Sequence, residues 1–62
     1  MSLREEMVRY RAKERISQSE LARRCGLSLQ TINSIENENQ TPSEITLMKI
    51  KMVVEEKKDA EN

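Results

Sequence analysis

Residues 17–37 read SQSELARRCGLSLQTINSIEN and contain two short helical patterns on either side of one glycine. The first helix is expected to open with the capping box SQSE at 17–20, in which a hydroxyl and a carboxylate each satisfy a free backbone N–H. It should end just before Gly26, because glycine readily adopts the left-handed conformation that closes a helix. The second helix is expected after Ser28, a good N-cap, and runs to about Asn37. Two short helices joined by a tight glycine-containing turn form a helix-turn-helix pattern.

The remaining chain adds two further helices and almost no strand signal. One helix is expected over about residues 3–14, with Ser2 as a candidate N-cap. Another should be opened by Pro42 and Ser43 and reach about Lys57, and residues 58–62 then read as a charged, disordered tail. The sequence therefore predicts an all-α bundle of four helices, forming a single domain over residues 1–57.

Composition removes several classes of function. The 62 residues include no His and a single cysteine, Cys25. Without His there is no Ser-His-Asp triad and no ordinary zinc site, so we expect no enzyme, no metal site and no cofactor. Cys25 could be a reactive thiol beside Arg24, but a small buried core residue is the more common role of a free cysteine. The longest apolar run is only Met52 to Val54, which predicts no membrane span and a cytoplasmic location.

The net charge of zero conceals a strong asymmetry along the chain. Residues 1–35 carry seven Lys or Arg and four Glu, a net charge of +3, whereas residues 36–62 carry four Lys and seven Asp or Glu, a net charge of −3. Such a distribution can arise from ordinary solvated helix faces. It is also what an anion-binding first half would show.

The helix after Ser28 has an unusual polar face. At about 100° per residue, Ile32 and Ile35 define a buried side. The opposite side carries only uncharged polar groups: Gln30, Asn33, Ser34 and Asn37. One interpretation is a neutral exposed helix. The other is a helix that reads DNA, because Asn and Gln can bond bidentately to adenine. Gln18, at the start of the preceding helix, is suitably placed to hold a phosphate.

A longer motif supports the second interpretation. The chain resembles the Cro/C1 (XRE) family of helix-turn-helix DNA-binding domains, with the lambda-repressor-like fold, over about residues 3–54. The residues that carry the resemblance are Ser17, Gln18, Glu20, Leu21, Ala22, Gly26, Leu27, Ser28, Thr31, Ile32, Ile35, Glu36 and Asn37, with Arg11, Pro42, Thr46, Leu47 and Ile50 outside them.

This resemblance implies roles for individual residues. Contacts with DNA bases are expected from Leu29, Gln30, Asn33 and Ser34. Contacts with the DNA backbone are expected from Gln18, Ser28 and Asn37. The resemblance also implies a partly buried structural ion pair between Arg11 and Glu36, although the two could instead be unrelated surface charges.

Three features depart from the family pattern. Glu38 stands where a glycine usually follows the helix that begins after Ser28, and a non-glycine residue in a left-handed conformation is strained. Its carboxylate would also repel phosphate. Arg15 stands where a glycine is often found before the helix that opens at residues 17–20. The fifth helix that most members carry is expected to be missing.

The expected fourth helix carries more apolar surface than a small isolated domain needs. Leu47, Ile50 and Val54 form one stripe, and Ile45, Met48 and Met52 form a second. Loose packing could bury both stripes. We favour a homodimer interface formed by Ile45, Met48 and Met52, because small domains commonly gain stability from self-association.

The leading functional hypothesis is a sequence-specific regulator of transcription that binds double-stranded DNA. It would be a phage- or plasmid-type repressor that acts by occupying its operator, with no small-molecule ligand. The alternative is a protein-interaction module on the same fold, an anti-repressor or an antitoxin component, that uses the apolar fourth helix. An enzyme is a distant third.

Overall fold

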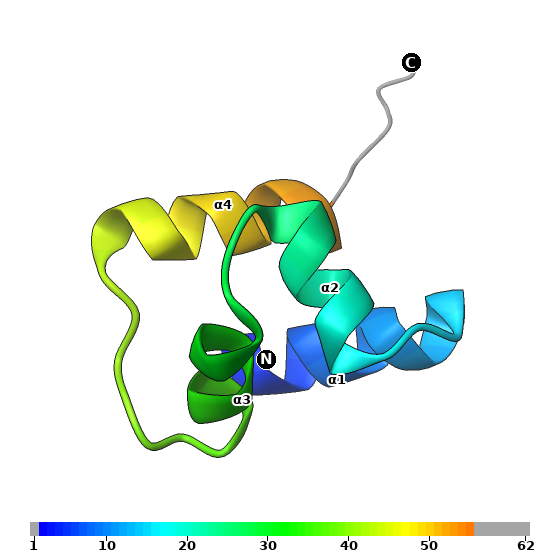
Figure 1. The fold of residues 1–62 in the computed structure, drawn as a ribbon, viewed down its shortest axis with the longest axis horizontal. Coiled ribbons are helices and arrows are strands. Elements are labelled where there is room, and N and C mark those ends of the chain that lie inside the picture. Colours follow the sequence, from blue (N-terminus) through cyan, green and yellow to red (C-terminus); the bar gives the residue numbers. More distant parts are fainter. Residues whose placement is uncertain (1, 56–62) are drawn as a thin grey trace.

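The structure is a computed structural model that describes residues 2–55, and it contains four α-helices in that range (Figure 1). They are α1 (Leu3–Glu14), α2 (Gln18–Cys25), α3 (Leu29–Glu36) and α4 (Glu44–Val54). No strand occurs among these residues, so the prediction of an all-α, four-helix fold is confirmed. The last helix is about three residues shorter than predicted, because α4 ends at Val54 and Glu55 is its C-cap rather than part of a helix reaching Lys57. The predicted charged tail at 58–62 lies outside the described residues.

A serine begins every helix. Each of the four N-cap serines has an extended backbone, and its hydroxyl accepts a hydrogen bond from the backbone N–H three residues later, at 3.1–3.2 Å. This bond satisfies one of the N–H groups that a helix start leaves without an intrahelical partner. The four caps are Ser2, Ser17, Ser28 and Ser43.

The predicted capping box at the start of α2 is only half correct. Ser17 accepts from the Glu20 N–H, but the Glu20 carboxylate does not return to the cap, because it accepts hydrogen bonds from Arg23 and Arg24. The complete capping box is at α1, where Ser2 and Glu5 exchange both bonds. Charged donors compete more strongly for a carboxylate than a backbone amide does.

One left-handed residue follows each of the first three helices, directly after α1 and α2 and one residue later after α3. These residues are Arg15 (φ 58°), Gly26 (φ 72°) and Glu38 (φ 59°). After each of them, the next N–H reaches back to the carbonyl five residues earlier, as in Ile16 to Arg11 at 3.0 Å. Only one of the three is glycine, so Arg15 and Glu38 carry the backbone strain that their side chains impose in this conformation.

The core is largely aliphatic, with Tyr10 as its one aromatic side chain, and draws on all four helices. Its four fully buried large side chains are Met7, Leu21, Ile32 and Ile50, one from each helix. Smaller residues of α2 complete it, among them Cys25, which is 6% exposed, so its prediction as a buried core residue is confirmed. Burial raises the pKa of the Cys25 thiol and so disfavours the reactive thiolate.

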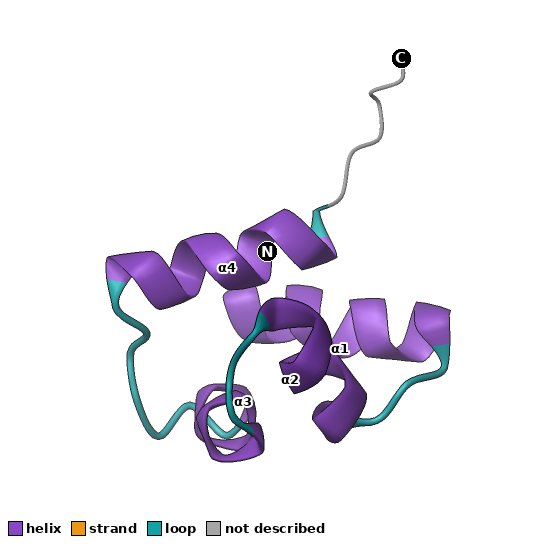
Figure 2. Ribbon diagram, turned by 45° about the horizontal axis from the view of Figure 1, so that its top comes forward, coloured by secondary structure: helices purple, strands orange, loops and turns teal. Residues whose placement is uncertain are grey.

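The helices have different directions: α1 and α4 both run roughly along the long axis of the molecule, and α2 and α3 are inclined to them (Figure 1 and Figure 2). Figure 1 shows α2 inclined to both α1 and α4; α1 contacts α3 and α4, and α2 likewise contacts α3 and α4. In Figure 2, α3 is seen nearly along its axis, at the edge of the molecule. A seven-residue connection, residues 37–43, then leads from α3 to α4. None of the helices within residues 2–55 has the length and apolar character needed to cross a membrane.

Candidate nucleic-acid interface

The turn between α2 and α3 fixes the relative direction of these helices. The Leu27 N–H donates to the Ala22 carbonyl at 2.9 Å, and the Gly26 N–H donates to the Arg23 carbonyl at 3.2 Å. Ala22 is 3% exposed, and its small side chain permits a close approach of the helices. Ser28 then caps α3 immediately after the turn. The result is a helix-turn-helix in which α3 is presented at the edge of the domain.

The outer side of α3 is polar and open to solvent. Ile32 and Ile35 are buried at 0% and 4% exposure and turn the opposite side of the helix outward. Gln30 and Asn33 are exposed, Leu29 is 46% exposed, and Ser34 is half-buried. The four residues expected to contact bases therefore lie on the accessible part of α3, with Ser34 the least accessible of them.

Two side chains of this outer side contact each other. Asn37 Nδ2 donates a hydrogen bond to Asn33 Oδ1, four residues earlier. By contrast, the amide of Gln30 has no hydrogen-bond partner within residues 2–55. The Gln30 amide can therefore bond to a ligand with its oxygen and both N–H groups. Asn33 and Asn37 each already use one polar group in their mutual hydrogen bond.

The residues expected to contact the DNA backbone all make bonds within the chain. Ser28 Oγ accepts from the Thr31 N–H at 3.1 Å and lies 2.9 Å from Thr31 Oγ1. Asn37 donates to Asn33, as above. Gln18 Nε2 donates to Glu36 Oε1 at 3.0 Å. Each side chain retains further hydrogen-bonding capacity for a phosphate, since an amide has two N–H donors and a hydroxyl has one proton to direct.

Glu36 is the residue on which α1, α2 and α3 meet. Arg11 donates to it with two nitrogens: Nη2 to Oε1 at 2.8 Å and Nε to Oε2 at 2.9 Å. With the bond from Gln18, three hydrogen bonds reach one carboxylate whose side chain is 6% exposed. The two residues expected to form the ion pair are therefore in bidentate contact, the strongest geometry for such a pair.

The environment of Glu36 acts on its pKa in two directions. Burial is the largest influence and raises the pKa, whereas the hydrogen bonds from Arg11 and Gln18 lower it, and the net result is a lowered pKa. The carboxylate is therefore ionised at neutral pH despite its burial. A buried anion of this kind is stable only while its donors remain in place.

Sequence reasoning missed a further contact at the same residue. Arg4 Nε donates to the backbone carbonyl of Glu36 at 2.9 Å, so α1 also holds the last turn of α3. No local sequence pattern predicts this bond, because the two residues are 32 positions apart. It depends entirely on how α1 packs against α3.

A second polar cluster ties α1 to α2. Arg24 donates to the hydroxyl of Tyr10 at 2.9 Å and to the carboxylates of Glu14 and Glu20 at 3.3 and 3.2 Å. Arg23 also pairs with Glu20, by Nε and Nη2. The spacings of three and four residues within α2 could have predicted the pairs with Glu20. The bond to Tyr10, the only aromatic residue, could not be read from spacing.

The second apolar stripe of α4 is uncovered. Ile45, Met48 and Met52 are 68%, 60% and 75% exposed, while Ile50 on the other side of the helix is fully buried. Val53 and Val54 are partly buried against the core, and Leu47 is half-buried. Residues 2–55 alone therefore do not bury both stripes.

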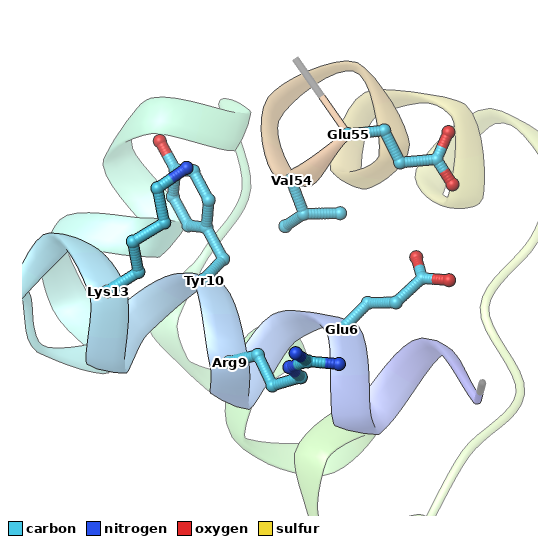
Figure 3. A pocket seen from close by; sticks show the side chains of 6 residues that line it. All are labelled: Glu6, Arg9, Tyr10, Lys13, Val54 and Glu55. Carbon is cyan, nitrogen blue, oxygen red and sulfur yellow. The ribbon is translucent and has the colours of Figure 1, made fainter. Parts of the chain in front are cut away.

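A shallow groove of about 290 Å³ lies between α1 and the end of α4 (Figure 3). Its lining is Glu6, Arg9, Tyr10, Lys13, Val54 and Glu55. Figure 3 shows the Glu6 side chain extending from α1 toward α4, and one of its carboxylate oxygens is buried without a hydrogen-bond partner among the described residues. Residues 2–55 contain no group of His, Cys, Asp and Glu that could hold a metal ion.

Comparison with known proteins gives one match. The family model described as helix-turn-helix matches residues 8–51, a range that includes α2 and α3 and most of α1 and α4. No curated protein and no solved structure matches the chain.

Proposed function

Because the chain belongs to the Cro/C1-type helix-turn-helix family of DNA-binding regulators, we propose that it is a sequence-specific repressor of phage or plasmid type. It would bind double-stranded DNA in the cytoplasm and act by occupying an operator. The observation that carries this proposal is the outer side of α3, where uncharged amides of Gln30 and Asn33 stand exposed opposite a buried apolar side.

In this proposal α3 enters the major groove. Leu29, at 46% exposure, supplies an apolar contact for a thymine methyl group, and Gln30, Asn33 and Ser34 supply hydrogen bonds to base edges. Gln18, Ser28 and Asn37 hold the DNA backbone from either end of the unit. The contacts of Glu36 with Arg11 and Gln18 support this arrangement, because they hold α1, α2 and the end of α3 in one relative orientation.

The proposed active species is a homodimer. The exposed stripe of Ile45, Met48 and Met52 supports it, since contiguous apolar surface of this kind is the usual signature of an interaction surface. A two-fold dimer would read two half-sites about 34 Å apart, one helical turn of DNA.

The same stripe favours the second candidate function. A protein-interaction module, such as an anti-repressor or an antitoxin component, would use α4 to bind a different protein. The acidic second half of the sequence fits that use better than DNA binding. We rank it second because it leaves the uncharged amide side of α3 without a role.

A selection from randomised duplexes with the purified chain tests the proposal. We expect a two-fold symmetric motif, and binding to its best member that is at least ~10³-fold tighter than to a scrambled duplex at the same salt concentration. Affinity for both duplexes should fall as salt rises. Recovery of no motif, with weak and equal binding to both duplexes, would favour the protein-interaction module.

A further inference from the structure

Two amides on the outer side of α3 form a pair in which each has a defined direction. Asn37 Nδ2 is the donor and Asn33 Oδ1 is the acceptor. Both side chains are exposed, and their spacing of four residues places them on the same side of the helix. That side lies opposite the buried Ile32 and Ile35, so the bond forms on the surface that we propose faces DNA.

The pairing changes what Asn33 can offer to a ligand. An asparagine amide has one acceptor oxygen and two N–H donors. In Asn33 the oxygen already accepts from Asn37, whereas neither N–H has a partner in the described part of the chain. Asn33 therefore presents donors to the solvent. Gln30 has no such partner, so its amide presents both a donor and an acceptor.

This difference matters because the bases differ in the major groove. Adenine offers an acceptor at N7 and a donor at N6, and a bidentate contact needs both groups of an amide. Guanine offers two adjacent acceptors, N7 and O6, and is matched by donors alone. At Asn33 a bidentate contact with adenine would compete with Asn37 for the same oxygen.

We propose that Asn37 acts as a positioning residue that makes Asn33 a hydrogen-bond donor, and that the base pair facing Asn33 is therefore read as guanine. Gln30 reads adenine on the same helix. The inference rests on the proposed function, because it assumes that α3 lies in the major groove. It assigns to Asn37 a role in sequence preference, in addition to the contact with the DNA backbone proposed above.

The experiment compares base preferences of the wild type and three variants. Asn33→Ala first identifies the base pair that Asn33 faces, as the position of the selected motif where preference disappears. Four duplexes that differ only at that pair are then titrated with the wild type, Asn37→Ala and Asn37→Asp. Asn37 is exposed, and thermal unfolding of each variant checks that the fold is retained.

The wild type should prefer guanine over adenine at this pair by about tenfold. Asn37→Ala frees the Asn33 oxygen, so Asn33 then presents the same groups as Gln30 and should prefer adenine. Asn37→Asp replaces the donor with an acceptor, so that Asn33 turns an N–H toward it and exposes its oxygen. This variant should bind all four duplexes more weakly but prefer adenine. The preference at the pair read by Gln30 should stay unchanged in both variants.

Two outcomes separate this inference from the proposed function. If a motif is selected and Asn33→Ala relaxes one position, but both Asn37 variants keep the wild-type preference there, Asn37 does not set the base and the inference is wrong. A uniform loss of affinity in Asn37→Ala, with the preference unchanged, would leave Asn37 with a phosphate contact alone. If no motif is selected, the proposed function itself fails.

Discussion

Gln18 and Glu36 are joined by a hydrogen bond of 3.0 Å from the side-chain amide of Gln18 to a carboxylate that also holds Arg11. The first residue of α2 is thereby connected to the last residue of α3. One N–H of the Gln18 amide is used inside the protein, and the other remains for a phosphate. A variant that lacks the Gln18 side chain should consequently be less stable and should bind DNA more weakly.

Gln18→Ala and Gln30→Ala should fail in different ways. Gln18→Ala should weaken binding to specific and scrambled duplexes together, and should lower the free energy of unfolding by about 1–2 kcal/mol, because a hydrogen bond to a charged group is lost. Gln30→Ala should cost ~1–3 kcal/mol on the best duplex alone and leave the melting temperature unchanged, since the side chain is exposed. Titration of both variants against both duplexes checks this. Equal losses of Gln30→Ala on the two duplexes would contradict a base contact.

Arg11→Ala should destabilise the fold much more than Arg23→Ala. Both arginines contact a carboxylate through Nε and Nη2, so the comparison is matched in geometry. Their partners differ in burial: the side chain of Glu36 is 6% exposed, and that of Glu20 is 29% exposed. We expect a loss of about 2–4 kcal/mol for Arg11→Ala, which leaves a buried charge without its main partner, and at most ~1 kcal/mol for Arg23→Ala. Urea unfolding measures both, and similar midpoints would argue against a structural role of burial here.

Stability should depend on pH through Glu36. Its pKa is lowered in the folded chain, so the ionised form is favoured by folding. The contribution is complete above the pKa of the unfolded chain and is lost as pH falls from there through the lower folded value. The wild type should therefore lose more of its free energy of unfolding over this range than Glu36→Gln does. Parallel pH profiles of the two proteins would exclude Glu36 as the titrating group.

Replacement of two methionines on α4 should produce a monomer. Met48→Lys with Met52→Lys places charges in the exposed stripe, and should shift sedimentation from dimer to monomer without loss of helix content, because these side chains lie outside the core. Val8→Lys is the matched control, since Val8 is also an exposed apolar residue, at 38%, but lies on α1. A wild type that sediments as a monomer at high concentration, and binds its best duplex as a single copy, would rule the dimer out.

Relief of backbone strain at Glu38 should stabilise the fold. Glu38→Gly removes a left-handed non-glycine residue, which costs ~1–2 kcal/mol. Part of that gain is offset by the greater backbone entropy that glycine loses, so a net gain of about 0.5–1 kcal/mol is expected. Glu38→Ala keeps the strain and should not gain stability. Both variants should bind DNA more tightly if the carboxylate repels phosphate. Comparison of the two variants therefore separates the effect of backbone strain on stability from the effect of charge on DNA binding.

The sequence was sufficient for features that are encoded locally. Ser17, Ser28 and Ser43 each set a helix start, and Gly26 sets a helix end, so these boundaries could be predicted from the chain itself. The end of α4 has no such signal and was predicted about three residues too late. The exposed amides of α3 followed from its period for the same reason.

Features that depend on tertiary packing could not be predicted in this way. The bond from Arg4 to the Glu36 carbonyl and the pairing of Gln18 with the Glu36 carboxylate need the fold to be known. The capping role expected of the Glu20 carboxylate was lost to two arginines on its own helix, a competition that spacing alone does not resolve. The direction of the bond between Asn33 and Asn37 likewise needed atomic positions.

The position of Glu36 also limits how α3 can rotate about its own axis. The side chains that bury α3, Ile32 and Ile35 among them, are held by contacts without direction, which tolerate a small rotation at little cost. Hydrogen bonds to the Glu36 carboxylate and carbonyl do have direction, and they come from both α1 and α2. A rotation of one residue would turn the amide side of α3 by about 100° and present different side chains outward. The hydrogen bonds to Glu36 on the inner side of α3 therefore fix the rotation of the helix about its axis. In this way they determine which residues of α3 point outward.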